Sequence, residues 1–230
     1  MAGRVTYHGG LVTDGLVLHL DAARKPSYPG SGDVWYDLTK ENYNATLNNS
    51  PSFIRNGEGG ISLDGTNDYI STPGDASRSQ YSLENSTFTI MFDDSRMDTN
   101  MYYLFSLATV FNCLWKRDSE TSHYIRVNNV TETALDLGTI TEGIIHLTIS
   151  IGENYLTKFY VNGTLRNTYD YSGYSTDYNW GYDIELGRRR GYELGYYSKF
   201  DYYAIMVHNR ALTEAEAIQN YNALKGRFGL

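Results

Sequence analysis

The closing segment of this chain, residues 205–230, constrains the fold most, because an apolar strand leads there into a single capped helix. Thr213 and Glu216 have the spacing of a capping box, in which each side chain bonds to the backbone of the other residue. One apolar stripe follows and consists of Ala217, Ile218, Tyr221 and Leu224. The pattern predicts a helix over about 213–225 that docks on the rest of the protein through this stripe.

The remainder of the chain is dominated by strand patterns separated by turns. Apolar and polar side chains alternate along 16–21, 88–92 and 145–151, which is the period of a half-buried strand. Turn signals such as Asp64-Gly-Thr-Asn67 and Asn162-Gly163 lie between apolar runs. Many short strands with one late helix predict an all-β fold, a two-sheet antiparallel jelly-roll sandwich with one C-terminal α-helix.

Length and composition favour a single domain. The chain has 230 residues, of which 41% are apolar and 20% charged, so it can bury a sizeable core. Residues 1–14 are polar and contain glycine, and we expect them to form an N-terminal arm. Residues 15–230 then form the jelly-roll domain.

Charge and cysteine content exclude several classes of protein. The 27 acidic residues outnumber the 19 basic ones, and the net charge of −8 would repel a phosphate backbone, so no nucleic-acid partner is expected. No stretch approaches the roughly 20 apolar residues that span a bilayer, so membrane insertion is not expected either. The single Cys113 excludes an intrachain disulfide, and stability must come from packing.

Several segments carry a resemblance to a known family. They are Gly15–Ala22, Ser27–Gly32, Val34–Leu38, Asn44–Leu47, Ser62–Ile70, Phe159–Gly163 and His208–Glu216. Together they closely resemble the laminin-G-like branch of the concanavalin A-like lectin/glucanase superfamily. With its closing run 221–229, the chain looks most like the version found in virion and tail-fibre proteins of tailed bacteriophages and in some bacterial surface proteins. The resemblance implies a jelly-roll sandwich with a binding or structural role and no shared catalytic set.

The function expected first is that of a non-enzymatic structural, decoration or fibre-associated protein of a tailed-phage virion. It would act through contacts with other virion proteins or with further copies of itself, as a homo-oligomer, and through adhesion to the host surface. The alternative is a lectin-like carbohydrate-binding module for cell-surface glycans, and a glycoside hydrolase ranks third. The expected location is the phage particle, with the bacterial cell surface or secretion as the alternative.

Catalytic motifs are missing from the sequence. Retaining glycosidases need two carboxyl groups about 5–5.5 Å apart, and the Glu-x-Asp-x-x-Glu motif of the related glucanases is absent. Asp183 and Glu185 form the only strand-like carboxylate pair, and we interpret them as a solvated strand end. The five histidines are scattered without the spacing of a zinc site. We therefore expect no catalytic residues and no cofactor.

Calcium has one candidate site, a turn that contains Asp64, Asn67 and Asp68. Ca²⁺ takes about six to eight oxygen ligands, more than one turn supplies. We favour a tight turn in which these side chains bond to the local backbone.

Tyrosine is unusually abundant, with 22 residues against 8 Phe and 3 Trp. The ligand or interface candidates crowd into residues 169–197: Tyr169, Tyr171, Tyr174, Tyr178, Trp180, Tyr182, Arg188, Arg189, Arg190, Tyr192, Tyr196 and Tyr197. Tyrosine suits half-buried strand positions, protein interfaces and sugar-stacking platforms alike. The arginine run is typical of a solvated loop or of pairing with carboxylates of a neighbouring subunit.

Overall fold

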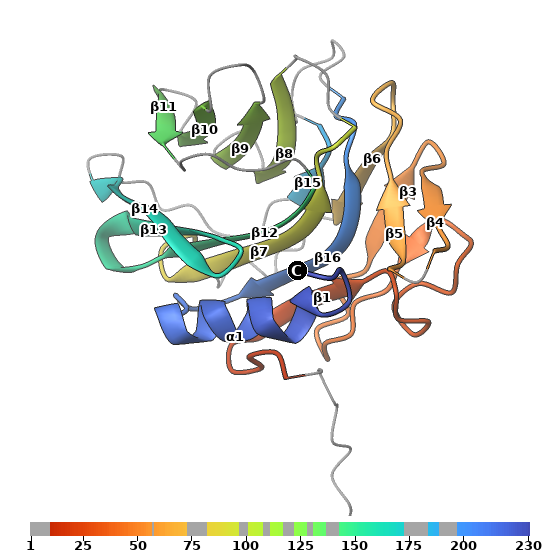
Figure 1. Cartoon of the computed structure of the whole chain (residues 1–230), viewed down its shortest axis with the longest axis horizontal. Helices are drawn as coiled ribbons and strands as arrows, with labels where there is room; N and C mark the ends of the chain where they lie inside the picture. The colour runs from red at the N-terminus through yellow and green to blue at the C-terminus, as the bar shows by residue number, and fades with distance from the viewer. Residues whose placement is uncertain are drawn as a thin grey trace, which may run out of the picture.

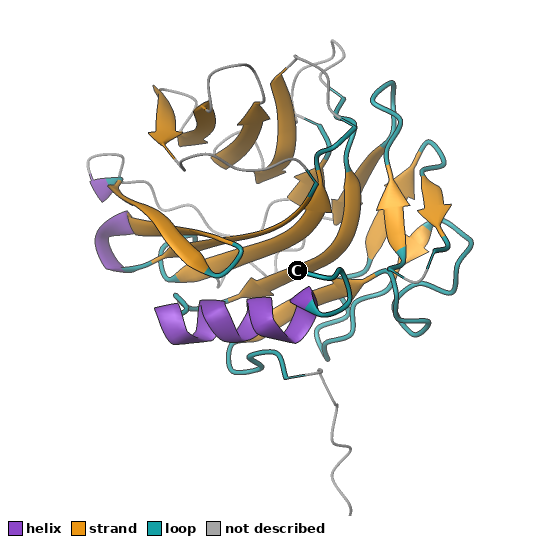
Figure 2. Ribbon diagram, viewed as in Figure 1, coloured by secondary structure: helices purple, strands orange, loops and turns teal. Residues whose placement is uncertain are grey.

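The computed structural model describes residues 10–56, 58–72, 82–96, 101–107, 111–116, 122–127, 131–136, 143–172, 184–188 and 197–230. Only the backbone is described at 101–102, 111–116, 122–127 and 131–136. These parts form a sandwich of two antiparallel sheets, and one α-helix lies along the outer face of the first sheet (Figures 1 and 2).

The first sheet has the strand order β14-β13-β12-β7-β16-β5-β4, and β1 pairs with β16 on the same side as β5. Its strands are β1 (Leu16–Asp21), β4 (Ser52–Ile54), β5 (Gly60–Ser62), β7 (Ser86–Asp93), β12 (Ile144–Ile151), β13 (Leu156–Val161), β14 (Thr164–Asp170) and β16 (Asp201–His208). A short 3₁₀ helix, η2 (Glu153–Tyr155), connects β12 to β13.

The second sheet has the strand order β11-β10-β9-β8-β15-β6-β3-β2. Its strands are β2 (Val34–Trp35), β3 (Ala45–Asn48), β6 (Tyr69–Thr72), β8 (Met101–Leu107), β9 (Phe111–Lys116), β10 (Ser122–Val127), β11 (Thr131–Asp136) and β15 (Ile184–Leu186). The predicted all-β, two-sheet antiparallel sandwich with one C-terminal helix is confirmed.

The main core lies between the two sheets. Strand β7 contributes Phe88, Ile90 and Phe92, each at most 3% exposed. The Phe88 ring stacks on Phe105 of β8 with ring centroids 5.4 Å apart, which links the two sheets directly. The period-2 pattern of the sequence therefore points its apolar side chains into the space between the sheets.

The helix α1 (Glu214–Lys225) begins as predicted. Thr213 is its N-cap, and the reciprocal capping box with Glu216 is present. Its buried face differs from the predicted stripe, because Asn220 is buried whereas Ile218 is 37% exposed. The cause is a long-range contact, since Asn220 Oδ1 accepts a hydrogen bond from the Val12 backbone N–H at 2.8 Å. Within the described residues, no helix combines the length and apolar character needed to cross a membrane.

The segment just before β1 packs against α1 and β16. Leu11 and Val12 are 7% and 6% exposed. The Nε2 atom of His208 bonds to the Val12 carbonyl at 3.0 Å, and the Gln219 side chain donates to the Gly10 carbonyl at 2.8 Å. Residues 10–12, which fall within the expected arm of residues 1–14, thus lie against the domain, whereas residues 1–9 lie outside the described residues.

Candidate functional site

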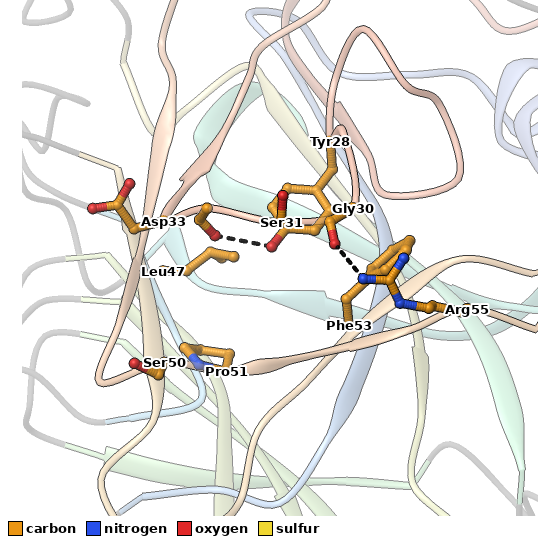
Figure 3. Close-up of a pocket in the computed structure, with 10 residues that line it drawn as sticks. Tyr28, Gly30, Ser31, Asp33, Leu47, Ser50, Pro51, Phe53 and Arg55 are labelled. Atoms are coloured by element: carbon orange, nitrogen blue, oxygen red, sulfur yellow. Dashed lines mark hydrogen bonds between the residues drawn. The ribbon is translucent and has the colours of Figure 1, made fainter.

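A cleft of about 510 Å³ opens between two segments near one end of the sandwich. One wall comes from residues 28–33, which precede β2, and the other from residues 47–55, which run from the end of β3 through β4. Figure 3 shows the lining side chains, with Asp33 at one end of the group and Arg55 at the other. Concave sites of roughly 300–1,000 Å³ are typical of small-molecule binding.

The first wall is a loop that is closed by its own contacts. The Tyr28 hydroxyl donates a hydrogen bond to the Gly32 carbonyl at 2.9 Å. Gly30 and Gly32 have φ values of +95° and +99°, a left-handed conformation that favours glycine. Below them, the buried Ser27 hydroxyl donates to the Tyr36 carbonyl at 2.6 Å, so the loop is tied to the strand that follows it.

The second wall presents Phe53 and Arg55, which lie two residues apart and therefore point to the same side of an extended chain. The Phe53 ring lies 5.1 Å from the Tyr28 ring, with the two planes tilted by 57°. The Arg55 guanidinium carbon is 5.7 Å from the Phe53 ring centroid, and Nη2 donates to the Gly30 carbonyl at 3.0 Å. These contacts join the two walls and hold the cleft open in a defined shape.

The electrostatics of the cleft keep Tyr28 as a neutral hydrogen-bond donor. Burial raises the pKa of Tyr28 above its ordinary value, the Arg55 charge lowers it in part, and the Asp33 charge raises it. Among the described lining residues, Asp33 is the one carboxylate. The cleft combines aromatic rings, hydroxyls and one charge of each sign, which suits binding of a polar ligand better than acid–base catalysis by two carboxyl groups.

Two of the tyrosine candidates lie where β14 ends. The Tyr169 and Tyr171 rings are 4.4 Å apart, and Tyr171 is only 2% exposed. Tyr171 belongs to the core between the sheets, and Tyr169 packs against that core from the side. Tyr169 thus occupies a half-buried strand position, whereas Tyr171 is a core residue.

Arg188 and Tyr197 form a cluster with Tyr69 and Glu185. Arg188 Nε and Nη2 each donate to a Glu185 carboxylate oxygen at 2.8 Å, and the guanidinium carbon lies 3.6 Å from the Tyr69 ring centroid. The hydrogen bonds to Glu185 raise the pKa of Arg188 above its ordinary value. Arg188 and Tyr197 are also joined by an isolated β-bridge. The Arg188 fork is therefore engaged within the chain.

The interpretation of Glu185 as a solvated strand end is wrong. Glu185 is 3% exposed, because β15 lies inside the second sheet between β6 and β8. Its partner in that reading, Asp183, lies outside the described residues. The same holds for eight of the ligand or interface candidates, which are Tyr174, Tyr178, Trp180, Tyr182, Arg189, Arg190, Tyr192 and Tyr196.

The calcium candidates Asp64, Asn67 and Asp68 form a tight turn. Asp64 Oδ1 accepts hydrogen bonds from the Thr66, Asn67 and Asp68 backbone N–H groups at 2.7, 3.2 and 3.3 Å. Burial is the largest single influence and raises the pKa of Asp64, but the three N–H donors together with the Thr66 hydroxyl outweigh it and lower the pKa below its ordinary value. The Asp68 carboxylate in turn accepts from the Asp64 N–H at 3.2 Å. The described residues contain no group of His, Cys, Asp and Glu suited to a metal ion.

The cleft residues were absent from the sequence-based candidates. Residues 27–32 are marked in the sequence only by the family resemblance, and residues 50–55 carry no motif. The available signal was local: Tyr28 is followed by two glycines separated by one residue, which indicates a loop with unusual backbone angles. The pairing of that loop with Phe53 and Arg55 depends on the tertiary fold.

The described strands form a two-sheet antiparallel β-sandwich, and solved structures share this fold. A Trypanosoma rangeli sialidase in complex with the inhibitor DANA matches with a TM-score of 0.70 and 14% identity over 92% of this chain and 33% of the sialidase. The same sialidase in complex with sialic acid gives a TM-score of 0.69 and 14% identity over 94% of this chain and 34% of the sialidase. The binding domain of botulinum neurotoxin serotype D matches with a TM-score of 0.67 and 13% identity over 91% of this chain and 52% of the toxin domain's chain.

These likenesses establish the fold. The chain spans about a third of the length of the sialidases that it matches. No family model matches the sequence, and no curated protein matches it. The β-sandwich predicted from the family resemblance is thus supported by structural neighbours.

Proposed function

We propose that this protein is a non-catalytic carbohydrate-binding module whose binding site is the cleft between residues 28–33 and 47–55. The observation that carries the proposal is the contact of Tyr28 with Phe53 inside a cleft that is otherwise lined by hydroxyl, carboxylate and backbone polar groups. A sugar ring has an apolar C–H face and a polar rim, and this lining offers a partner for each.

The sugar would lie with its C–H face against the half-buried Phe53 ring, which packs on the buried Tyr28, and with its hydroxyls toward the polar wall. Aromatic rings provide a large rigid contact area at low cost in conformational entropy. Ser31, Asp33 and Ser50 are exposed at the cleft and can donate to or accept from hydroxyl groups. Since the loop 28–33 is already closed by its own hydrogen bonds, binding requires little reorganisation.

Two of the structural neighbours support this proposal. One neighbour is a sialidase that holds sialic acid, and another is a toxin binding domain. The single carboxylate among the described cleft residues supports binding rather than hydrolysis. The role in a phage virion that the family resemblance suggests stays a prediction, because neither the cleft nor these neighbours bears on it.

The proposal is tested by applying the purified chain to a glycan array and measuring the affinity of the best hit by calorimetry. Phe53→Ala should weaken binding by about tenfold or more through loss of the stacking surface. Ser31→Trp should also block binding, because it fills the cleft from an exposed position that folding does not require. Tyr36→Ala is the matched control, since Tyr36 is a 44% exposed aromatic outside the cleft lining.

Two results would contradict the proposal. One is an array on which the folded protein binds no glycan. The other is a bound glycan whose affinity is the same in the wild type, Phe53→Ala and Ser31→Trp proteins. Release of reducing sugar from a bound glycan would show that the protein is an enzyme and not a binding module.

A further inference from the structure

We infer that the cleft selects a glycan that carries a carboxylate, such as a uronic or sialic acid, and that Arg55 receives this carboxylate. The inference rests on the proposed carbohydrate-binding function and names the ligand class of the same site. It follows from a difference between Arg55 and four other arginines of the described chain.

Those four arginines are paired with carboxylates. Arg96 pairs with Asp201, Arg188 with Glu185, Arg210 with Glu216 and Arg227 with Asp21, at N···O distances of 2.5 to 2.8 Å. Arg55 is exposed and takes part in no ion pair among the described residues. Its positive charge is therefore available to a ligand.

The Arg55 side chain is also held in place. Nη2 donates to the Gly30 carbonyl at 3.0 Å, and the guanidinium group lies over the Phe53 ring. An arginine has five N–H donors, so one bond to Gly30 leaves most of the planar fork free at the cleft. A carboxylate matches that fork with two parallel hydrogen bonds. An arginine held in this way loses less side-chain entropy when it binds than a freely moving one.

The net charge of the whole chain also affects which ligand can bind in the cleft. With a net charge of −8, the protein repels anions in general, so an anionic ligand needs a specific cation close by. Asp33 at the far end of the cleft would repel a carboxylate there and accept hydrogen bonds from hydroxyls instead (Figure 3). The two charges thus give the ligand one direction, with its carboxylate at Arg55 and its hydroxyls toward Asp33.

The test compares glycans that end in glucuronate with otherwise identical glycans that end in glucose, which differ only in the carboxylate at C6. We expect the wild type to prefer the glucuronate member by about tenfold, a typical gain for a charge-assisted hydrogen bond at a partly exposed site. Arg55→Gln should abolish this preference, so that the glucuronate and glucose members bind with equal affinity, and Arg55→Lys should keep part of the preference. Raising the salt concentration should reduce the preference in the wild type.

The matched control is Arg166→Gln, which removes an exposed arginine on β14, outside the cleft lining. It should leave the preference intact. Equal binding of both members by the wild type, or an acid preference that survives in Arg55→Gln, would overturn the inference while the binding function stands. Absence of binding to every glycan would instead contradict the proposed function itself. Binding to sialic acid-terminated glycans that depends on Arg55 would support the inference.

Discussion

The central strands β7, β12 and β16 of the first sheet are buried on both faces, but by different partners and through different chemistry. On β7, the inner side chains Phe88 and Ile90 face the second sheet, whereas Thr87 and Thr89 point to the outer side. Both threonines are 0% exposed because α1 and its entry loop cover that side (Figure 1). Alternating apolar and polar residues therefore do not separate buried from exposed positions in this sheet.

Hydroxyl groups on the outer face anchor the loop that leads into α1. Thr87 Oγ1 donates to the Arg210 carbonyl and accepts from the Leu212 N–H, both at 2.9 Å. Ser150 Oγ on β12 donates to the Leu212 carbonyl at 2.9 Å. The inner face is stabilised by apolar burial, and the outer face adds directional hydrogen bonds that set where the helix begins.

Two buried histidines on the outer face make the stability of that face depend on pH. His146 and His208 are both 0% exposed, and burial lowers the pKa of each to about 4. The His146 ring lies 5.6 Å from the Tyr221 ring of α1. The inner side chains of β7 and β12 are apolar and do not titrate, so acid should act on the helix-covered face.

The largest effect is expected from a change on the inner face. Ile149→Ala should lower the free energy of unfolding by about 2–5 kcal/mol, because Ile149 is 0% exposed and its removal leaves a cavity. The adjacent change Thr148→Ala, on the outer face, should cost about 1 kcal/mol through loss of its hydrogen bond to Thr89. Urea denaturation of both variants measures the two free energies of unfolding. Equal losses would contradict the proposed difference between the inner and outer faces.

Acid should destabilise the protein through the two histidines. Their folded pKa of about 4 lies below the unfolded value near 6.5, so their contribution is fully present above about pH 6.5 and is lost as the pH falls toward 4. Each histidine should cost about 1.4 kcal/mol per pH unit in this window, or about 2 kcal/mol at pH 5. His146→Gln should show a smaller loss than the wild type between pH 7 and pH 5 in urea titrations. If His146→Gln lost as much stability as the wild type in this pH range, His146 would not contribute to the acid sensitivity.

A smaller effect is expected from the hydroxyl that anchors the helix entry. Thr87→Val keeps the shape of the side chain but leaves the Leu212 N–H and the Arg210 carbonyl without this partner. We expect a loss of about 1–2 kcal/mol in the free energy of unfolding. Protection of the α1 amides from hydrogen exchange should fall at the same time. Thr87→Ser, which keeps the hydroxyl, is the control and should retain that protection.

The smallest effect is expected at the helix cap. Thr213→Ala removes the side chain that accepts from the Glu216 N–H, and the cost should be about 1 kcal/mol. Thr213→Ser should restore most of the stability, because serine caps equally well. A thermal melt of the three proteins decides this, and a loss in Thr213→Ala as large as that of Ile149→Ala would mean that capping governs docking of the whole helix.

Local sequence patterns predicted where the helix begins, but they did not predict which of its faces is buried. The capping box set the helix start correctly at Thr213, because both partners lie within one turn. The buried face was misjudged at Ile218 and Asn220, because the Asn220 partner, Val12, is 208 residues away in sequence. Hydrophobicity alone predicts that Ile218 is buried and Asn220 exposed. The N-terminal segment reverses this, because Asn220 bonds to Val12 and is buried there.

The candidate site shows the same limit more strongly. Tyrosine abundance pointed to residues 169–197, and there Tyr171 is a core residue while Arg188 is bound to Glu185. The cleft instead combines a loop before β2 with residues around β4, and neither segment carries a motif of its own. Composition reports how many aromatic rings a chain has, but not which of them remain at the surface.

The sequence by itself determined the all-β class, the turns and the single capped helix, because these follow from side-chain periodicity and from hydrogen bonds between near neighbours. The tertiary structure decided which polar residues are buried and which charges stay unpaired. Glu185 and Arg188 lie three residues apart and form an ion pair, whereas Arg55 contacts Gly30 and Phe53 but none of the carboxylates in the described part of the chain. Burial and charge pairing depend on contacts between distant segments, and only the folded chain brings those segments together.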